Sequence, residues 1–158
     1  MKKSKSAFTM VELIFVIVII GILAAVAIPR LTITRDDAKI SKTVSNLKIL
    51  LYDSFSFYTS QGDEVWKVSK WGDVTDTLDS VQGTTSVLNS TVKVYGEDGV
   101  DCFTITSNTD SNGTALTVVS NNNTDVICSK AHILAKDAGI VNSLTTSKLT
   151  LGGQSISF

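Results

Sequence analysis

The chain has 158 residues, which is enough for one domain and a helical stalk. Fourteen basic and fifteen acidic residues give a formal net charge of −1, so a general role in DNA binding is not indicated. The sequence contains no CxxC pair, no phosphate-binding loop and no nucleophile motif, so we predict neither an enzyme nor a bound cofactor.

The N-terminus combines a basic start with a long apolar run. Three lysines and no acid come first, which predicts that this end stays in the cytoplasm. Residues 8–28 follow, and as a helix they would span roughly 30 Å, the thickness of a bilayer core. We therefore predict a transmembrane helix over residues 8–30.

One acidic residue lies at the start of this run. Glu12 precedes the uncharged stretch 13–28. A carboxylate inside a membrane segment costs about 2.5–3.5 kcal/mol on insertion scales, and an ordinary signal peptide or anchor has no use for it. Its presence indicates a subunit that meets a positively charged group in the membrane. A break between Ala7 and Phe8 would supply an α-amine four residues before Glu12.

The segment Ala7-Phe8-Thr9-Met10-Val11-Glu12 resembles the processing site of type IV pilins and type II secretion pseudopilins. The resemblance implies that a prepilin peptidase removes a leader, residues 1–7, by cutting between Ala7 and Phe8. It also implies N-methylation of Phe8 and a role in assembly for Glu12, the fifth residue of the mature chain. Pro29 ends the apolar stretch as in that family, whereas Ala7 stands where glycine is usual.

The resemblance further implies a cellular route. The precursor would cross the bacterial inner membrane once, in contact with membrane lipid. An inner-membrane assembly platform would then polymerise it with the same or other pilins into a periplasmic or cell-surface filament. Loss of the three leader lysines leaves eleven basic and fifteen acidic residues, a net charge of −4.

Two positions in the apolar helix are predicted to weaken it. Pro29 lacks an amide donor and clashes with the preceding turn, and Gly21 adds a flexible position. The resemblance implies that helicity can be lost between such positions in a filament. A gentle kink without a function is the alternative.

Another class of protein remains open. A secretory signal peptide also has a basic start and an apolar core, and Ala25-Val26-Ala27 resembles its cleavage site. Cleavage there would release a soluble exported binding protein. That interpretation leaves Glu12 and the polar Thr9 unexplained.

The helical pattern continues beyond the apolar run. Residues 31–60 are predicted to form an amphipathic helix that ends near Gln61-Gly62 and packs on a globular head, residues 61–158. Its apolar stripe comprises Ile40, Val44, Leu47, Leu51, Phe55 and Tyr58.

The head begins with a segment of weak pattern. Trp66 and Trp71 are interpreted as core residues at its margin, with contact to another protein as the less favoured alternative. Residues 73–81 are predicted to form a short helix.

The rest of the head alternates apolar and polar residues. This period of two predicts strands at 91–95, 102–106 and 114–120, with an Asn112-Gly113 turn before the third. A short helix is expected within 126–141, and a second hairpin runs from 148–151 to 154–158 through two glycines. The predicted fold class is α+β, with four or five antiparallel strands against the long helix.

Cys102 and Cys128 lie in the part expected to be exported, where disulfides persist. We predict a bond between them that contributes about 3.5 kcal/mol, with two buried free thiols as the alternative. Major pseudopilins resemble this N-terminus but usually have a C-terminal calcium loop and no disulfide pair. The cysteines therefore favour a pilus over a secretion pseudopilus, and the pseudopilin stays the alternative.

Three smaller patterns are weak. Glu97, Asp98 and Asp101 gather carboxylates that Ca²⁺ could bind, but a solvated turn is favoured. Asn112 lies in a sequence that resembles a bacterial glycosylation acceptor, although a turn role is favoured. His132 has no ligand pattern around it and is interpreted as a surface or core residue.

Overall fold

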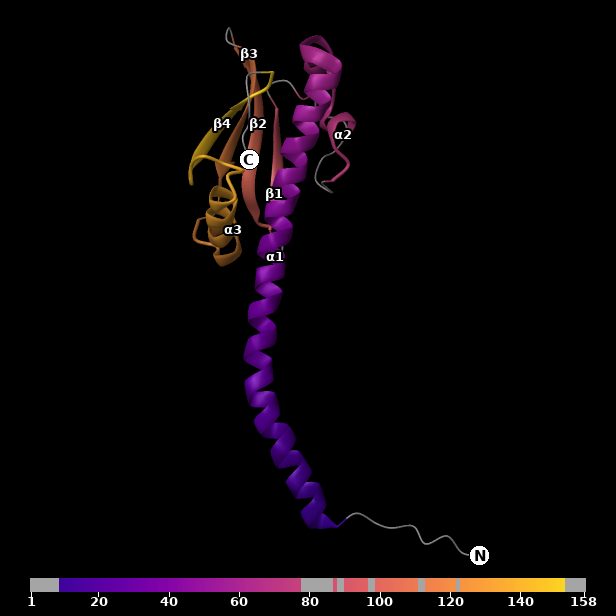
Figure 1. The fold of residues 1–158 in the computed structure, drawn as a ribbon, viewed down its shortest axis with the longest axis vertical. Coiled ribbons are helices and arrows are strands. Elements are labelled where there is room, and N and C mark those ends of the chain that lie inside the picture. Colours follow the sequence, from indigo (N-terminus) through magenta and orange to yellow (C-terminus); the bar gives the residue numbers. More distant parts are fainter. Residues whose placement is uncertain are drawn as a thin grey trace, which may run out of the picture. The chain divides into compact units, whose positions relative to one another are not determined.

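A computed structural model describes residues 9–77, 87, 90–96, 99–110, 113–121 and 123–152 (Figure 1). It confirms the α+β class. In chain order the elements are α1 (Met10–Val68), α2 (Trp71–Val74), β1 (Thr91–Tyr95), β2 (Asp101–Asp110), β3 (Gly113–Ser120), α3 (Val126–Asp137) and β4 (Thr146–Thr150). The chain divides into two compact units, Met1–Asp37 and Ala38–Phe158, and we describe each by itself.

The described residues of the second unit form a four-stranded sheet of order β1-β2-β3-β4, in which every neighbouring pair is antiparallel. The register of the strands aligns one residue from each strand in a row across the sheet. Val92 pairs with Ile105, Ile105 with Val118 and Val118 with Ser147, and all four are buried. This row faces the core, as the alternating pattern predicts.

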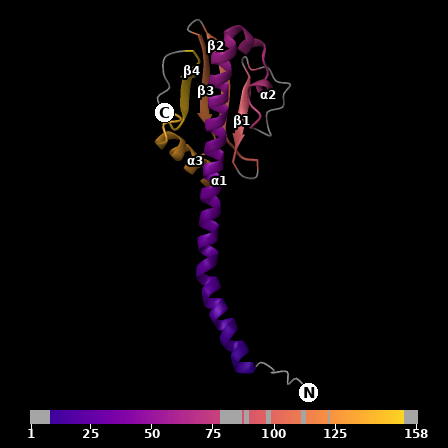
Figure 2. The ribbon, with the colours of Figure 1, turned by 45° about the vertical axis from the view of Figure 1, so that its right-hand side comes forward.

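The part of α1 in this unit lies along one face of the sheet (Figure 2). Ile40, Val44, Leu47 and Leu51 of the predicted stripe are buried, and the larger rings of Phe55 and Tyr58 pack partly buried against the same core. Leu50 is also fully buried, although it lies outside the stripe. Packing against the sheet thus covers a wider face of the helix than the stripe alone indicates.

The predicted helix stop at Gln61-Gly62 is a break rather than an end. Gly62 adopts φ 81° and ψ 174°, which favours glycine, and helical residues then resume as far as Val68. The turn brings Trp66 into the core, where it packs edge to face against Trp71 with 6.1 Å between the ring centroids. The Trp66 indole nitrogen donates a hydrogen bond to Ser107 at 3.1 Å, and that of Trp71 donates to Ser90 at 2.8 Å. Both tryptophans are core residues, as expected.

The predicted helix over residues 73–81 is wrong for its described part beyond Val74. The backbone of Thr75 is extended, with φ −150° and ψ 138°, because its hydroxyl donates to Asp53 of α1 at 2.6 Å. This tertiary bond ends α2 after four residues. Residues 78–81 lie outside the described part of the chain.

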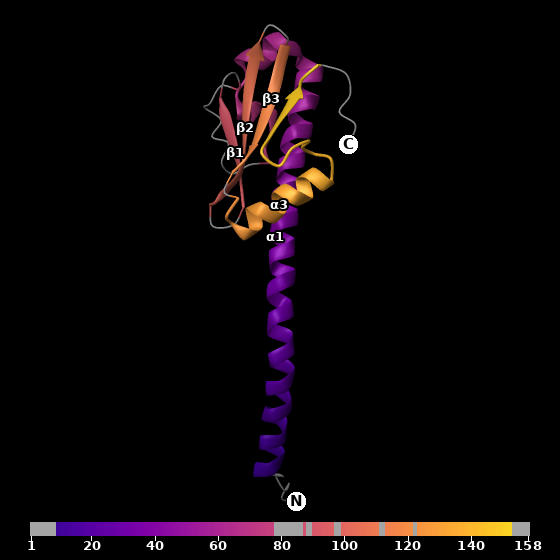
Figure 3. The ribbon, with the colours of Figure 1, turned by 90° about the vertical axis from the view of Figure 1, so that its left-hand side faces the viewer.

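The three predicted strands at 91–95, 102–106 and 114–120 are confirmed, and β2 continues to Asp110 because its polar end keeps pairing with β3. The short helix within 126–141 is confirmed as α3, which crosses beside α1 (Figure 3). β4 supplies the first strand of the predicted last hairpin. Its return strand, 154–158, lies outside the described residues, as does Asn112.

Candidate functional site

The described part of the first unit is the apolar stretch of α1. Met10–Ile28 is 19 residues long with a mean hydropathy of 3.1, long and apolar enough to cross a membrane, and none of it is buried within the protein. Even large side chains such as Phe15 and Ile22 remain 66% and 63% exposed. A helix that is apolar all round belongs in a membrane or in the core of a larger assembly. A signal sequence near the N-terminus can meet the same criteria of length and hydropathy.

Glu12 does not stand alone at the start of this helix. Thr9 precedes the first helical residue, and both its backbone nitrogen and its hydroxyl donate to Oε2 of Glu12 at 2.9 Å. In return, the Glu12 backbone nitrogen donates to the Thr9 hydroxyl at 3.2 Å. This reciprocal arrangement is a capping box.

The capping box gives a role to Thr9, which the signal-peptide interpretation leaves unexplained. Thr9 supplies local hydrogen bonds to a carboxylate that would otherwise enter an apolar environment without a partner. The pattern T-x-x-E before an apolar run is a recognised signal for it, so Thr9 could have been found from the sequence. Both bonds use one oxygen, Oε2, so Oε1 takes part in neither.

Only some of the other predicted positions in this segment lie among the described residues. Ala7 and Phe8 lie outside the described residues, so cleavage and methylation there stay predictions. The backbone remains helical at Gly21 and Pro29, and the one non-helical residue in the described α1 is Gly62. The loss of helicity between Gly21 and Pro29 in a filament therefore also stays a prediction.

In the second unit the two cysteines are bonded. The Cys102–Cys128 disulfide joins β2 to α3 with a Cα–Cα distance of 4.9 Å, and both residues are fully buried. The Asp125 side chain caps α3 by accepting from the Cys128 nitrogen at 2.8 Å. Asp125 and the two sulfurs lie close together, but bonded sulfurs are not thiolates and the carboxylate serves as a helix cap. This cluster therefore gives no support for a metal centre.

The buried histidine lies beside the disulfide. His132 Nε2 shares a hydrogen bond with the Cys102 carbonyl oxygen at 2.8 Å. Its ring packs edge-on against Phe103 with 4.9 Å between the ring centroids. His132 is only 3% exposed. It is a core residue with a backbone partner, in agreement with the interpretation of its sequence context.

Of the three carboxylates in the weak calcium candidate, only Asp101 lies among the described residues. Asp101 forms an ion pair with Lys93 at 3.0 Å across the β1–β2 pair. The hydrogen bond that Lys93 donates to Asp101 raises the pKa of Lys93, because it stabilises the charged form of the lysine. Glu97 and Asp98 lie outside the described residues.

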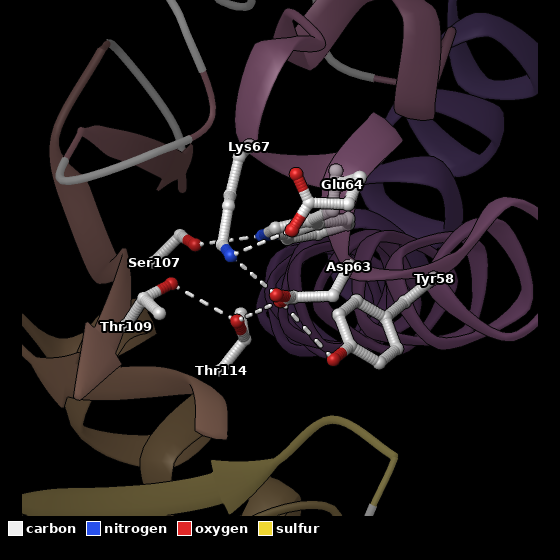
Figure 4. Close-up of polar contacts among 8 residues, drawn as sticks. Tyr58, Asp63, Glu64, Lys67, Ser107, Thr109 and Thr114 are labelled. Atoms are coloured by element: carbon white, nitrogen blue, oxygen red, sulfur yellow. Dashed lines mark hydrogen bonds and ion pairs between the residues drawn. The ribbon is translucent and has the colours of Figure 1, made fainter. Parts of the chain in front are cut away.

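Sequence reasoning missed a polar junction where the end of α1 meets β3 (Figure 4). Oδ1 of Asp63 accepts from the Thr114 hydroxyl at 2.7 Å and from the Tyr58 hydroxyl at 3.3 Å, while Oδ2 pairs with Lys67 at 2.5 Å. These bonds, that from Lys67 first, lower the pKa of Asp63. Thr114 also shares a hydrogen bond with Thr109 of β2 at 2.9 Å.

The junction also holds the tyrosine. Burial and then the Asp63 charge raise the pKa of Tyr58, which keeps its hydroxyl protonated as a donor. No local pattern reveals this cluster, because its central bond joins residues 51 positions apart. Its role is to fasten the helix to the sheet.

Comparison with known proteins locates the functional signal in the first unit. Residues 2–28 match the family model described as the prokaryotic N-terminal methylation motif. The comparisons found no significant match among curated proteins or among solved structures. The N-terminal segment therefore carries the signal of type IV pilin-like and pseudopilin precursors, whose apolar helix fits a membrane-anchored precursor that later joins a filament.

Proposed function

We propose that this chain is a structural subunit of a type IV pilus-like filament, a pilin or minor pilin, and not an enzyme. One observation carries the proposal: an apolar helix, none of it buried within the protein, bears a single carboxylate at its start and lies within the match to the methylation motif. Such a helix needs cover from outside the chain. Lipid provides it in the precursor, and the helices of other subunits provide it in the filament.

The assembly step follows from charge. Prepilin peptidase removes residues 1–7 and methylates the new amine of Phe8. In the filament this amine lies beside Glu12 of a neighbouring subunit, because each charge offsets the burial of the other. Before assembly, Thr9 supplies the hydrogen bonds that the carboxylate needs. Thr9 bonds to only one carboxylate oxygen, which leaves the other for an incoming amine.

Location and partners follow from the same route. The precursor spans the bacterial inner membrane once with its N-terminus in the cytoplasm, as the leader lysines favour. An assembly platform in that membrane extracts it into a periplasmic or cell-surface filament of the same or related pilins.

The disulfide supports a pilus rather than a secretion pseudopilus. The head is stapled by Cys102–Cys128, and Asp101 of the carboxylate cluster is paired with a lysine. A head of this kind needs no calcium. We expect its thermal unfolding midpoint to be the same in millimolar Ca²⁺ and in EDTA. A calcium-induced rise of several degrees would favour the pseudopilin.

The proposed function is tested with Glu12→Ala in the full chain. We expect normal cleavage but roughly tenfold fewer filaments, because the buried amine loses its counter-charge. The matched control is Asp76→Ala, which removes an exposed carboxylate from the head. Filament yield is measured by shearing and quantitative blotting. Normal yield from Glu12→Ala would contradict the proposal.

A further inference from the structure

A groove runs between α1 and α3 in the second unit. Its volume is about 270 Å³, and its lining combines apolar side chains with two serines and one lysine: Ser41, Val44, Ser45, Lys48, Leu134, Ala138 and Ile140. Leu134 is 40% exposed, so an apolar wall faces solvent. The small serines let another side chain approach the α1 backbone closely, and exposed Lys48 adds a positive charge.

A complementary surface lies at the end of α1. After the break at Gly62, Val65 and Val68 are 40% and 79% exposed, and the Glu64 side chain is 92% exposed. Val68 lies three residues after Val65 and four after Glu64, so it neighbours both of them on the helix surface. We call Glu64, Val65 and Val68 the end ridge. It presents two apolar side chains beside one carboxylate.

The groove and the end ridge lie at opposite ends of the same compact unit. Figure 3 shows α3 crossing α1 at one end of the head, whereas the last turns of α1 lie at the other end. The charged residues of α1 also differ between these two ends. Residues 38–50 carry three lysines and no acid, while 51–68 carry three acids and one lysine.

We propose that the end ridge of one copy docks into the groove of a second copy, with Glu64 beside Lys48. The apolar side chains of Val65 and Val68 suit the apolar walls of the groove. The charges at the groove end and at the ridge end of the unit are opposite. Lys67 does not cancel the match, because it is shared between Asp63 and Glu64 and leaves this turn with a net charge of −1. The inference rests on the proposed function and names the surfaces that join neighbouring heads.

The geometry of this contact suits a polymer. Two different surfaces at opposite ends of one unit make a heterologous contact, which adds subunits in an open series rather than closing a dimer. The charge pair fixes which end meets which, and the apolar side chains contribute more of the affinity.

Charge exchange in the full chain tests the pairing. Lys48→Glu and Glu64→Lys should each lower filament yield about fivefold, since an attraction becomes a repulsion. The double variant Lys48→Glu/Glu64→Lys should return yield to within about twofold of wild type, since the opposite charges are restored. The mismatched control is Lys130→Glu/Glu64→Lys, which changes an exposed α3 lysine outside the groove and should not recover.

The possible outcomes separate this inference from the proposed function. If the wild-type chain forms no filaments, the proposed function fails and the docking contact fails with it. If filaments form but single exchanges leave yield unchanged, or the double exchange does not restore it, only the docking contact is overturned. Thermal unfolding followed by tryptophan fluorescence should be alike for all variants, since these side chains are exposed.

Photo-crosslinking identifies the occupant directly. A benzophenone side chain at position 45 in the groove should crosslink, within intact filaments, to the peptide of another copy that contains Val68. Crosslinks confined to residues 10–28 would show that the groove receives an apolar helix and would overturn the proposed occupant. Filaments without any crosslink between copies at this position would also overturn it.

Discussion

The two parts of α1 are built from the same kind of backbone but differ in what covers them. From Met10 to Ile28 the helix is apolar on every face and none of it is buried within the protein. From Ala38 onward one face of the helix is covered, and residues such as Leu47 are fully buried against the sheet. The comparison shows that the second part is covered by its own chain, whereas the first part is not.

The largest expected effect on the head comes from its disulfide. Cys102→Ser or Cys128→Ser should lower the free energy of unfolding of the head by about 3.5 kcal/mol, because the unfolded chain is no longer constrained. Membrane insertion should be unchanged, since the apolar segment lies in the other unit. Urea unfolding in detergent, followed by the fluorescence of the two buried tryptophans, gives the first value. Carbonate extraction of membranes reports insertion.

Non-reducing mass spectrometry supplies the control. The wild-type chain, taken from the cell envelope without reductant, should resist alkylation at both cysteines. Two freely alkylatable thiols would contradict the Cys102–Cys128 disulfide and favour the pseudopilin interpretation.

The same substitution at two places on α1 tests the comparison itself. Leu47→Ala should cost the head about 3 kcal/mol, because a buried side chain is replaced by a cavity. Leu23→Ala, at a position 64% exposed, should leave the unfolding of the head unchanged. Equal losses in urea unfolding would mean that the first part of α1 is stabilised by the head after all.

A smaller effect is expected at the turn after β4. Gly152 has φ 74°, and a Cβ there would lie 2.9 Å from Cε1 of Tyr58. Gly152→Ala should destabilise the head by about 2 kcal/mol through backbone strain and this clash. Gly99→Ala is the matched control, because Gly99 has φ 76° with open space around it. If both variants lose the same stability in thermal unfolding, the Tyr58 contact adds nothing.

The smallest effect concerns pH and the junction at Asp63. Its pKa is lowered in the folded head, chiefly by the hydrogen bond from Lys67. The junction therefore stabilises the head above the pKa of an unfolded aspartate, and this contribution is lost as pH falls below about 4. Asp63→Asn should be less stable than wild type at pH 7, with a difference that shrinks toward pH 3. A constant difference in urea unfolding would exclude a role for the carboxylate charge.

Local patterns predicted much of the architecture. The N-terminal motif predicted the apolar helix, the helical spacing predicted the burial of Leu47 and its neighbours, and the period of two predicted the strands. Each depends on residues close in sequence. The sequence also indicated the disulfide, because the chain has only two cysteines and the head was expected to lie in an oxidising compartment.

Long-range contacts account for what was missed. Gly62 was interpreted as a stop, but its φ value redirects the chain so that Asp63 meets Thr114 and Trp66 enters the core. Likewise, Thr75 ends α2 by bonding to Asp53, 22 positions earlier. No pattern of propensity or period carries such information. The Thr9–Glu12 capping box differs, since its spacing of three was visible in the sequence.

The central claim is that the apolar part of α1 is kept as an assembly helix rather than removed. Mass spectrometry of the N-terminal peptide, from full chain expressed in a bacterium with a prepilin peptidase, tests this claim most directly. The account predicts a mature chain that begins at an N-methylated Phe8. A chain that begins at Ile28, or one that keeps its leader, would contradict it.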